Sequence, residues 1–475
     1  MLCAYPAFMP FEQIDRFAAE EQMDKEGDNR IGAGILYIMR HNLNNGHTCV
    51  PVKKFLPIVQ TFLDVDEDKI EIMLMRLQDS GEIIKVPLEA VEYFYLPEFY
   101  RAEIFTANRI AALMKFPIDD SINIEKSIAE METKTDITYA PLQKKAIAAA
   151  LQNNAIVLTG GPGTGKTTTV NAIISLLEGY CDKVLLAAPT GRAAKRLSEL
   201  TGKKATTIHR LLEVDFKTVG DEISFIHNSR NRLKCDAVII DEMSMVDALL
   251  FENLLDALKE NCRLILVGDV DQLPSVGAGN VLKGIIDSKV MPVICLKEVF
   301  RQAAQSLIVS NAHRIVKGEM PVAGAKTDDF FMIEANALGT QQLVLDLVCD
   351  RLPKSYNFSP INDIQVLCPS KIGATGTVKL NELLQERLNP KGSRPEFHWG
   401  EQSYREGDKV MQIKNNYDIQ YQRDDGECGA GAFNGDIGVI ESVNAKASEV
   451  KVRFDDRVYV YTTEFIRQLE LAYAV

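Results

Sequence analysis

The apolar positions of this chain change their spacing several times, and each spacing predicts a different kind of element. In the middle of the chain, short and almost wholly apolar runs predict buried strands, at residues 156–158, 184–188, 237–240 and 263–267. Between these runs, apolar residues recur every three or four positions, as from Val170 to Leu177, and predict helices. Strands that alternate with helices indicate an α/β fold.

The two ends of the chain follow other patterns. Residues 1–98 have mostly helical spacing, with an apolar face from Ile70 to Leu77 and two strand-like runs after Gly81. This order predicts a winged-helix-like module, which either binds DNA or only mediates packing. Residues 99–137 are polar and charged and indicate a connector. Over residues 396–468 the apolar positions alternate around turn signals such as Asn434-Gly435, which predicts a small β-barrel.

Composition narrows the class of protein. A chain of 475 residues with 46% hydrophobic and 25% charged residues is typical of a soluble protein of several domains. No apolar run approaches the roughly 18 residues of a membrane span, so we expect a cytoplasmic protein with no membrane partner. The nine cysteines are scattered and form no Cys-x-x-Cys pair, which predicts reduced thiols and no zinc site. The net charge of −13 argues against coating nucleic acid with the whole surface but allows a local basic groove.

A glycine-rich loop separates the first apolar run from its helix. Gly160-xxxx-Gly165-Lys166-Thr167 has the spacing of a phosphate-binding loop, with a chance glycine loop as the alternative. Backbone N–H groups of such a loop surround a polyphosphate, Lys166 adds a positive charge near the β and γ groups, and Thr167 offers its hydroxyl to Mg²⁺. The predicted nucleotide-binding residues are Gly161, Pro162, Gly163, Thr164, Gly165, Lys166, Thr167 and Thr168.

An acidic pair, Asp241-Glu242, directly follows the run 237–240. Two carboxylates opposite a phosphate loop fit a division of labour in which Asp241 holds Mg²⁺ and Glu242 polarises the attacking water. The alternative is a cap for the helix that follows, but capping explains one carboxylate more easily than two.

Two glutamines are further candidates. Gln272 follows the run 263–267, where a polar side chain that touches the γ-phosphate and steers the next loop converts hydrolysis into motion. Gln143 lies at a helix start ahead of the first strand, where its amide can offer both a donor and an acceptor to an adenine edge. Away from this place in the chain it would be an ordinary helix-surface glutamine.

The motifs occur in the order of a known family: GGPGTGKT at 160–167, APTGRAA at 188–194, TIHRLL at 207–212, IDEMSM at 240–245, GDVDQLP at 268–274 and VFRQ at 299–302. This set resembles the RecD family of superfamily 1 helicases. Within that family it is most similar to the stand-alone RecD-like helicases of bacteria, which work without RecB and RecC.

The resemblance implies ATP hydrolysis coupled to 5'-to-3' movement on single-stranded DNA, with duplex junctions as a further partner. It implies two RecA-like P-loop lobes, an inserted Src-homology-3-like barrel and a short return to the second lobe, at residues 138–300, 301–395, 396–468 and 469–475. It also adds Arg301 as a second-lobe arginine that reaches the γ-phosphate, where a cation stabilises the charge of the transition state.

The same resemblance assigns residues to the path of the DNA strand, namely Thr190, Arg192, Thr207 and His209. Capping and helix-surface roles are the alternative for each. Lys371, in the glycine-rich stretch 369–376, is a further candidate for a phosphate contact. Residues 212–234 predict a protruding hairpin, which in similar helicases splits the duplex; a merely decorative hairpin is the alternative.

The second lobe is predicted to be incomplete. Apolar runs at residues 330–333 and 364–368 predict two of its strands, but the last two motifs of the family find no match before Val475. We therefore expect a chain truncated before those motifs, with impaired turnover. The alternative function is a non-unwinding DNA-dependent ATPase or a scaffold subunit of a nuclease or recombination complex.

Overall fold

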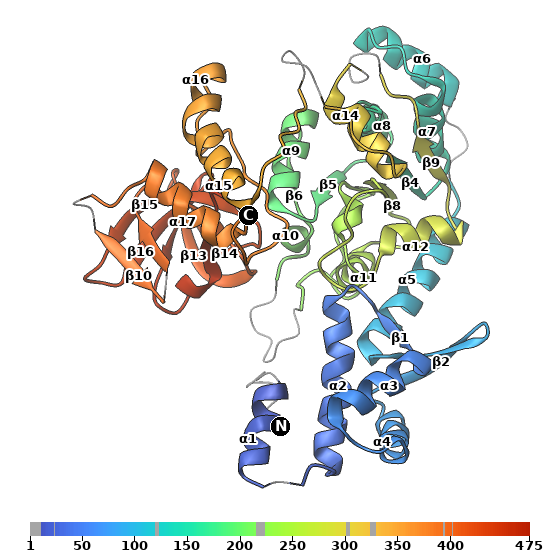
Figure 1. Ribbon diagram of the computed structural model, residues 1–475. Coiled ribbons are helices and arrows are strands. Elements are labelled where there is room, and N and C mark those ends of the chain that lie inside the picture. Colours follow the sequence, from blue (N-terminus) through green and yellow to red (C-terminus); the bar gives the residue numbers. More distant parts are fainter. Residues whose placement is uncertain are drawn as a thin grey trace. The chain divides into compact units, whose positions relative to one another are not determined.

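The computed structural model describes residues 11–22, 24–118, 123–214, 224–300, 305–323, 329–392, 395–400 and 402–475. These residues form two compact units, whose elements are labelled in Figure 1. The first unit holds the described residues up to Pro189 together with those of Ala193–Val322, and the second holds Thr190–Arg192 and the described residues of Ala323–Val475. Among the described residues, every helix is too short or too polar to cross a membrane.

The centre of the first unit is a six-stranded parallel sheet with the order β6-β5-β7-β8-β4-β9. Its strands are β4 (Ala155–Gly160), β5 (Val184–Ala188), β6 (Ala205–Thr207), β7 (Ala237–Ile240), β8 (Arg263–Gly268) and β9 (Val293–Leu296). Successive side chains point to opposite faces, so Val157 and Ile240 join one apolar core while Ile156 and Ile239 join the other. Burial on both faces explains the unbroken apolar runs of β4 and β7, and the predicted α/β fold is confirmed.

Helices cover both faces of this sheet. On one face lie α5 (Pro97–Lys115), α10 (Ile208–Leu212), α11 (Ala248–Ala257) and α12 (Val281–Ser288). On the other lie α6 (Ile124–Thr135), α7 (Pro141–Gln152), α8 (Lys166–Leu177) and α9 (Gly191–Thr201). Helices α5 and α6 come from the predicted connector, and α5 is fixed by Arg109, whose Nη2 donates to the carbonyl oxygens of Leu258 and Lys259 at 2.9 and 2.7 Å. These carbonyls follow the end of α11, where a cation is favourable.

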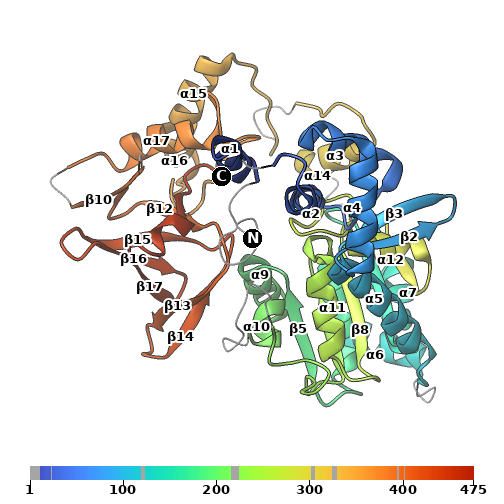
Figure 2. The same ribbon diagram turned by 90° about the horizontal axis from the view of Figure 1, so that it is seen from below.

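The amino-terminal part of the first unit has the predicted winged-helix-like order. It consists of α1 (Phe11–Glu20), α2 (Asp28–Asn44), β1 (Cys49–Pro51), α3 (Val52–Leu63), α4 (Glu67–Asp79), β2 (Ile84–Leu88) and β3 (Val91–Tyr95). The strands form an antiparallel sheet in the order β1-β3-β2, and the β2–β3 hairpin projects from the module in both views (Figure 1, Figure 2).

This amino-terminal module is joined to the loop that follows β8. The backbone N–H of Gly279 donates to the carbonyl oxygen of Gly46 at 3.0 Å. Ala248 and Ala278, which flank the same contact, belong to the apolar core of the module. Gly279 has a φ of 104°, and a Cβ there would lie 2.8 Å from that of Ala248, so only glycine permits this approach.

The second unit is built on a seven-stranded antiparallel sheet with the order β14-β13-β17-β16-β15-β12-β18. Its strands are β12 (Lys409–Gln412), β13 (Asn416–Arg423), β14 (Cys428–Ala432), β15 (Ile437–Asn444), β16 (Glu449–Phe454), β17 (Arg457–Tyr461) and β18 (Leu469–Leu471). A separate hairpin is formed by β10 (Glu396–Trp399) and β11 (Gln402–Arg405). The alternating apolar pattern therefore predicted β structure in this region correctly.

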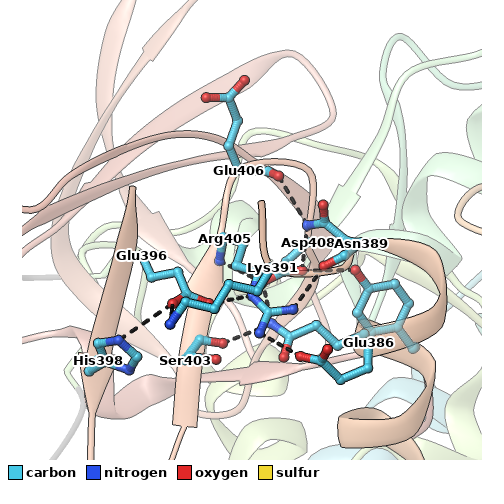
Figure 3. A network of polar contacts seen from close by, with 11 residues as sticks. Glu386, Asn389, Lys391, Glu396, His398, Ser403, Arg405, Glu406 and Asp408 are labelled. Atoms are coloured by element: carbon cyan, nitrogen blue, oxygen red, sulfur yellow. Dashed lines mark hydrogen bonds and ion pairs between the residues drawn. The ribbon is translucent and has the colours of Figure 1, made fainter. Parts of the chain in front are cut away.

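Buried polar side chains attach this sheet to helix α17 (Thr377–Leu388). Asp408 is fully buried and accepts hydrogen bonds from Gln385 Nε2, Asn389 Nδ2, the Arg405 N–H and Tyr473 OH, at 2.6, 2.8, 2.6 and 2.9 Å. Figure 3 shows the guanidinium of Arg405 in the same network, where it donates to Glu386 and Glu396 at 2.6 and 2.5 Å. We call these residues, centred on Asp408 and Arg405, the junction network.

The remaining helices of the second unit are α15 (Ala337–Asp346) and α16 (Leu352–Tyr356), joined by the helical turn Leu347–Arg351. The strands predicted at 330–333 and 364–368 are wrong. Residues 330–333 lie outside any strand, and the run 364–368 makes one parallel bridge, between Val366 and Ala474.

The predicted hairpin at 212–234 is described only at its base. Val214 and Phe225 form an antiparallel bridge, and the His227 N–H donates to the Leu212 carbonyl at 2.9 Å. Residues 215–223 lie outside the described residues, so the tip stays a prediction.

Candidate nucleotide-binding site

Three strands of the parallel sheet bring the predicted chemistry to one edge. β4 pairs with β8, and β8 pairs with β7, so the carboxyl ends of all three lie side by side. The phosphate loop follows β4, the acidic pair follows β7, and Gln272 follows β8. In open parallel sheets, ligands bind outside this edge.

The phosphate loop has the backbone that its glycines predict. Gly163 and Gly165 have φ of 73° and 79°, in the left-handed region that glycine adopts without strain. Thr164 donates from its hydroxyl to the carbonyl of Gly161 at 2.8 Å and so fixes the turn. Lys166, Thr167 and Thr168 are the first residues of α8, whose N-terminus favours an anion.

Lys166 lies at the centre of the site. Its ammonium donates to the carbonyl oxygens of Gly160 and Gly161, the latter at 3.0 Å. Burial raises the pKa of Asp241 and of Glu242, and the charge of Lys166 opposes this rise at both. Lys166 is therefore near enough to both carboxylates for its charge to act on them, and its role toward ATP stays a prediction.

Burial governs the two carboxylates. Burial raises the pKa of Asp241 above its ordinary value, and the Glu242 N–H, which donates to it at 2.9 Å, opposes this. Burial and then the charge of Asp241 raise the pKa of Glu242. Glu242 also has a φ of 53°, an unusual conformation for a residue with a side chain and one that clusters at functional sites.

The oxygen donors present suit Mg²⁺. The Thr167 hydroxyl and the Asp241 carboxylate are hard ligands of the type this ion prefers. Two buried hydroxyls nearby in the chain, Thr159 Oγ1 and Ser244 Oγ, have no hydrogen-bond partner among the described residues. Buried polar atoms without partners are rare and mark places where a ligand or water completes the structure.

Gln272 is exposed on the turn after β8. Asp269, which is buried, accepts from the Asp271 N–H at 3.1 Å, and its carbonyl accepts from the Gln272 N–H at 3.3 Å. These bonds hold the turn, while the Gln272 side chain remains accessible. Its γ-phosphate role stays a prediction.

Gln143 is buried, and both ends of its amide contact backbone groups. Its Oε1 accepts from the Ala140 N–H at 2.9 Å, and its Nε2 donates to the Gly165 carbonyl at 3.3 Å. The glutamine thus connects the start of α7 to the phosphate loop. Recognition of adenine, which needs the same two groups, stays a prediction.

Three residues at this site were not predicted from the sequence. Arg196, on α9, lowers the pKa of Asp241 and Glu242 together with Lys166. The Phe300 N–H donates to the Gly163 carbonyl at 3.2 Å, and His313 contacts Pro162. Arg196 lies two residues after the motif APTGRAA, which could have pointed to it. His313 lies 147 positions after Lys166 in the printed sequence, and no motif points to it.

The residues predicted to bind the DNA strand are distributed over both units. Thr190 and Arg192 lie at the start of α9, and Arg192 is exposed. Thr207 caps α10, since its hydroxyl accepts from the Arg210 N–H at 3.2 Å. Lys371 forms an ion pair with Glu470 at 2.9 Å. Arg301 lies outside the described residues.

His209 has an environment that the sequence did not reveal. Burial lowers its pKa to about 4, and its ring lies 6.0 Å from that of Phe225. At neutral pH the imidazole is therefore uncharged, so any contact with a phosphate would use a neutral donor.

Comparison with protein families gives two matches. Residues 143–278 match an AAA domain, and residues 380–454 match the SH3 domain of ATP-dependent RecD-like DNA helicases. The first match contains Gln143, the phosphate loop, the acidic pair and Gln272.

Individual relatives agree with these matches. An ATP-dependent RecD2 DNA helicase of Deinococcus radiodurans is 34% identical over 381 residues, covering 80% of this chain and 48% of the relative. A RecBCD enzyme subunit RecD of Mycolicibacterium smegmatis is 30% identical over 331 residues, covering 63% and 56%. The chain spans about half the length of these curated relatives. A solved Pif1 helicase from Candida albicans is 18% identical, with a TM-score of 0.37 and coverage of 71% of this chain and 85% of that one.

Proposed function

We propose, from its similarity to RecD and RecD2 helicases, that the chain belongs to the RecD-like helicase family and is the ATP-hydrolysing motor part of a DNA helicase. The observation that carries the proposal is the shared site of Lys166, Asp241 and Glu242 at the carboxyl edge of the parallel sheet. A lysine on a phosphate loop beside two half-buried carboxylates is the arrangement that phosphoryl transfer to water requires.

Each residue of the site has a proposed role. The N–H groups of the loop and Lys166 bind the phosphates of ATP, and Thr167 with Asp241 would hold Mg²⁺. When bound, the ion neutralises charge on the β and γ oxygens. Glu242 accepts a proton from the attacking water, a role for which its raised pKa improves the match to neutral pH.

One aromatic ring and one amide flank the loop, at the place where the base of ATP would follow its phosphates. A Cβ at Gly165 would lie 2.5 Å from the ring of Phe300 and 2.6 Å from Nε2 of Gln143. We propose that this ring and amide border the adenine of ATP. Gln272 and Arg301 remain the proposed contacts of the γ-phosphate, through which hydrolysis is coupled to 5'-to-3' movement on single-stranded DNA.

ATPase and strand-displacement assays test the proposal. The chain should hydrolyse ATP faster with single-stranded DNA, and Lys166→Ala and Glu242→Gln should each abolish this. Partial duplexes with a 5' or a 3' tail then test direction, since a 5'-to-3' motor opens only the 5'-tailed substrate. The rate of ATP hydrolysis with single-stranded DNA also tests whether turnover by this chain is impaired, as we expect. DNA-stimulated hydrolysis without strand displacement would indicate the non-unwinding ATPase or scaffold instead.

A further inference from the structure

The segment after β9 returns to the phosphate loop and contacts it a second time, through helix α14 (Leu307–Val316). Nε2 of His313 lies 3.3 Å from the carbonyl oxygen of Pro162. Because a carbonyl oxygen only accepts, Nε2 carries the hydrogen and donates it. In Figure 1, α14 lies next to α8, the helix that begins at the end of this loop.

The same imidazole fills the space beside Gly161. A Cβ at Gly161 would lie 2.6 Å from Cε1 of His313, and the three heavy atoms nearest to it all belong to this ring. Gly161 does not have a positive φ, so its backbone would accept alanine. The imidazole, and not the backbone conformation, is therefore what excludes a side chain at this position.

Other contacts fix the orientation of α14. Asn311, 1% exposed, donates to the Val322 carbonyl and accepts from the Val322 N–H, both at 2.8 Å. Arg314 donates from Nε to the Met320 carbonyl at 2.9 Å. The chain after α14 thus folds back on the helix and bonds residues that precede and follow His313. These bonds fix the rotation of the helix about its axis.

We propose that His313 is a positioning residue for the phosphate loop: its N–H on the Pro162 carbonyl holds the first turn of the loop in the shape that binds phosphate. The inference rests on the proposed function, because it assigns a role in binding ATP. Lys166 already donates to the carbonyls of Gly160 and Gly161, so His313 extends the same support to the next residue. A preformed loop loses less freedom when the nucleotide binds, and therefore binds it more tightly.

Nucleotide affinity tests this role with three replacements of His313. The dissociation constants of fluorescent ATP and ADP analogues would be measured for the 475-residue chain by titration. His313→Phe keeps the ring and loses the donor, and should weaken binding about 3- to 10-fold, as should His313→Ala. His313→Gln places an amide N–H near the position of Nε2 and should remain within about twofold of the original chain. Ile315→Ala, an exposed site on the same helix, is the control.

A double-substitution cycle tests the contact itself. Gly161→Ala should weaken binding about tenfold or more beside His313, and much less when combined with His313→Ala, because the smaller residue makes room. Equal effects of Gly161→Ala in both backgrounds, or His313→Phe within twofold of the original chain, would overturn the inference. Thermal midpoints would show that the variants are folded. If the original chain itself bound no nucleotide, the proposed function would fail instead.

Discussion

Gln143 holds the start of α7 and the end of the phosphate loop together, because its amide accepts from the Ala140 N–H at 2.9 Å and donates to the Gly165 carbonyl at 3.3 Å. The two bonds use opposite ends of one side chain, and the residue is 3% exposed. A replacement can therefore remove one bond and keep the other.

Gln143→Glu should separate the two roles. A carboxylate still accepts from Ala140 but has no N–H for Gly165, so ATP affinity should fall about 3- to 10-fold. Gln143→Ala loses both bonds and should in addition lower the thermal midpoint, since the Ala140 N–H is left without its partner. Titration with a fluorescent ATP analogue and thermal unfolding measure the two effects. Identical affinities for the Glu variant and the original chain would show that the loop does not depend on this amide.

The pH dependence of hydrolysis should reflect the burial of Glu242. A raised pKa means that the carboxylate takes up a proton at a higher pH than usual, and the protonated form cannot accept one from water. As pH falls, kcat/KM should therefore decline with a midpoint above 4.5, the ordinary value for glutamate. Glu242→Gln should lower kcat about 100-fold or more at every pH while ATP still binds. An acid limb at or below the ordinary value would contradict the assignment.

The strands and the acidic pair were predictable because burial on both faces leaves a signal in every residue of a strand. β7 is wholly apolar and β4 is apolar from Ala155 to Leu158, and their chemistry follows them directly in sequence. The run 364–368 is also apolar except for Gln365, yet it forms only the bridge from Val366 to Ala474, since a strand also needs a partner that sequence spacing does not reveal. His313 could not be predicted for a similar reason: its contact with Pro162 depends on how the chain returns after β9.

His209 should make the first unit less stable in acid. Its pKa is about 4 in the folded protein and 6.5 ordinarily, so between these values the unfolded chain binds the proton more readily. Stability should therefore be retained above pH 6.5 and fall as pH drops toward 4, by up to about 3 kcal/mol.

Thermal midpoints measured between pH 7 and pH 5 would check this. His209→Leu should flatten the decline, because it removes the group that takes up the proton. Ile315→Ala, at an exposed and non-titrating side chain of the same unit, should leave the decline unchanged. The same decline in the original chain and in His209→Leu would show that another group is responsible.

The junction network should be essential for the stability of the second unit. Asp408→Ala leaves four donors without their acceptor in a site closed to water, and should destabilise the unit by roughly 3 kcal/mol or more. Asp408→Asn keeps one oxygen and should cost less. Unfolding in urea, followed by circular dichroism, measures the loss, with Glu464→Ala as an exposed control. Similar urea midpoints for Asp408→Ala and the control would refute the role.

The hydrogen bond from Gly279 to Gly46 connects the amino-terminal helices to the parallel-sheet part of the first unit. Ala248 and Ala278 lie in the core of those helices, yet one is in α11 and the other follows the turn that carries Gln272. Heat should therefore melt both parts in a single calorimetric peak. A partner that binds these helices would therefore contact the same body that carries the loop of Gln272, the proposed contact of the γ-phosphate.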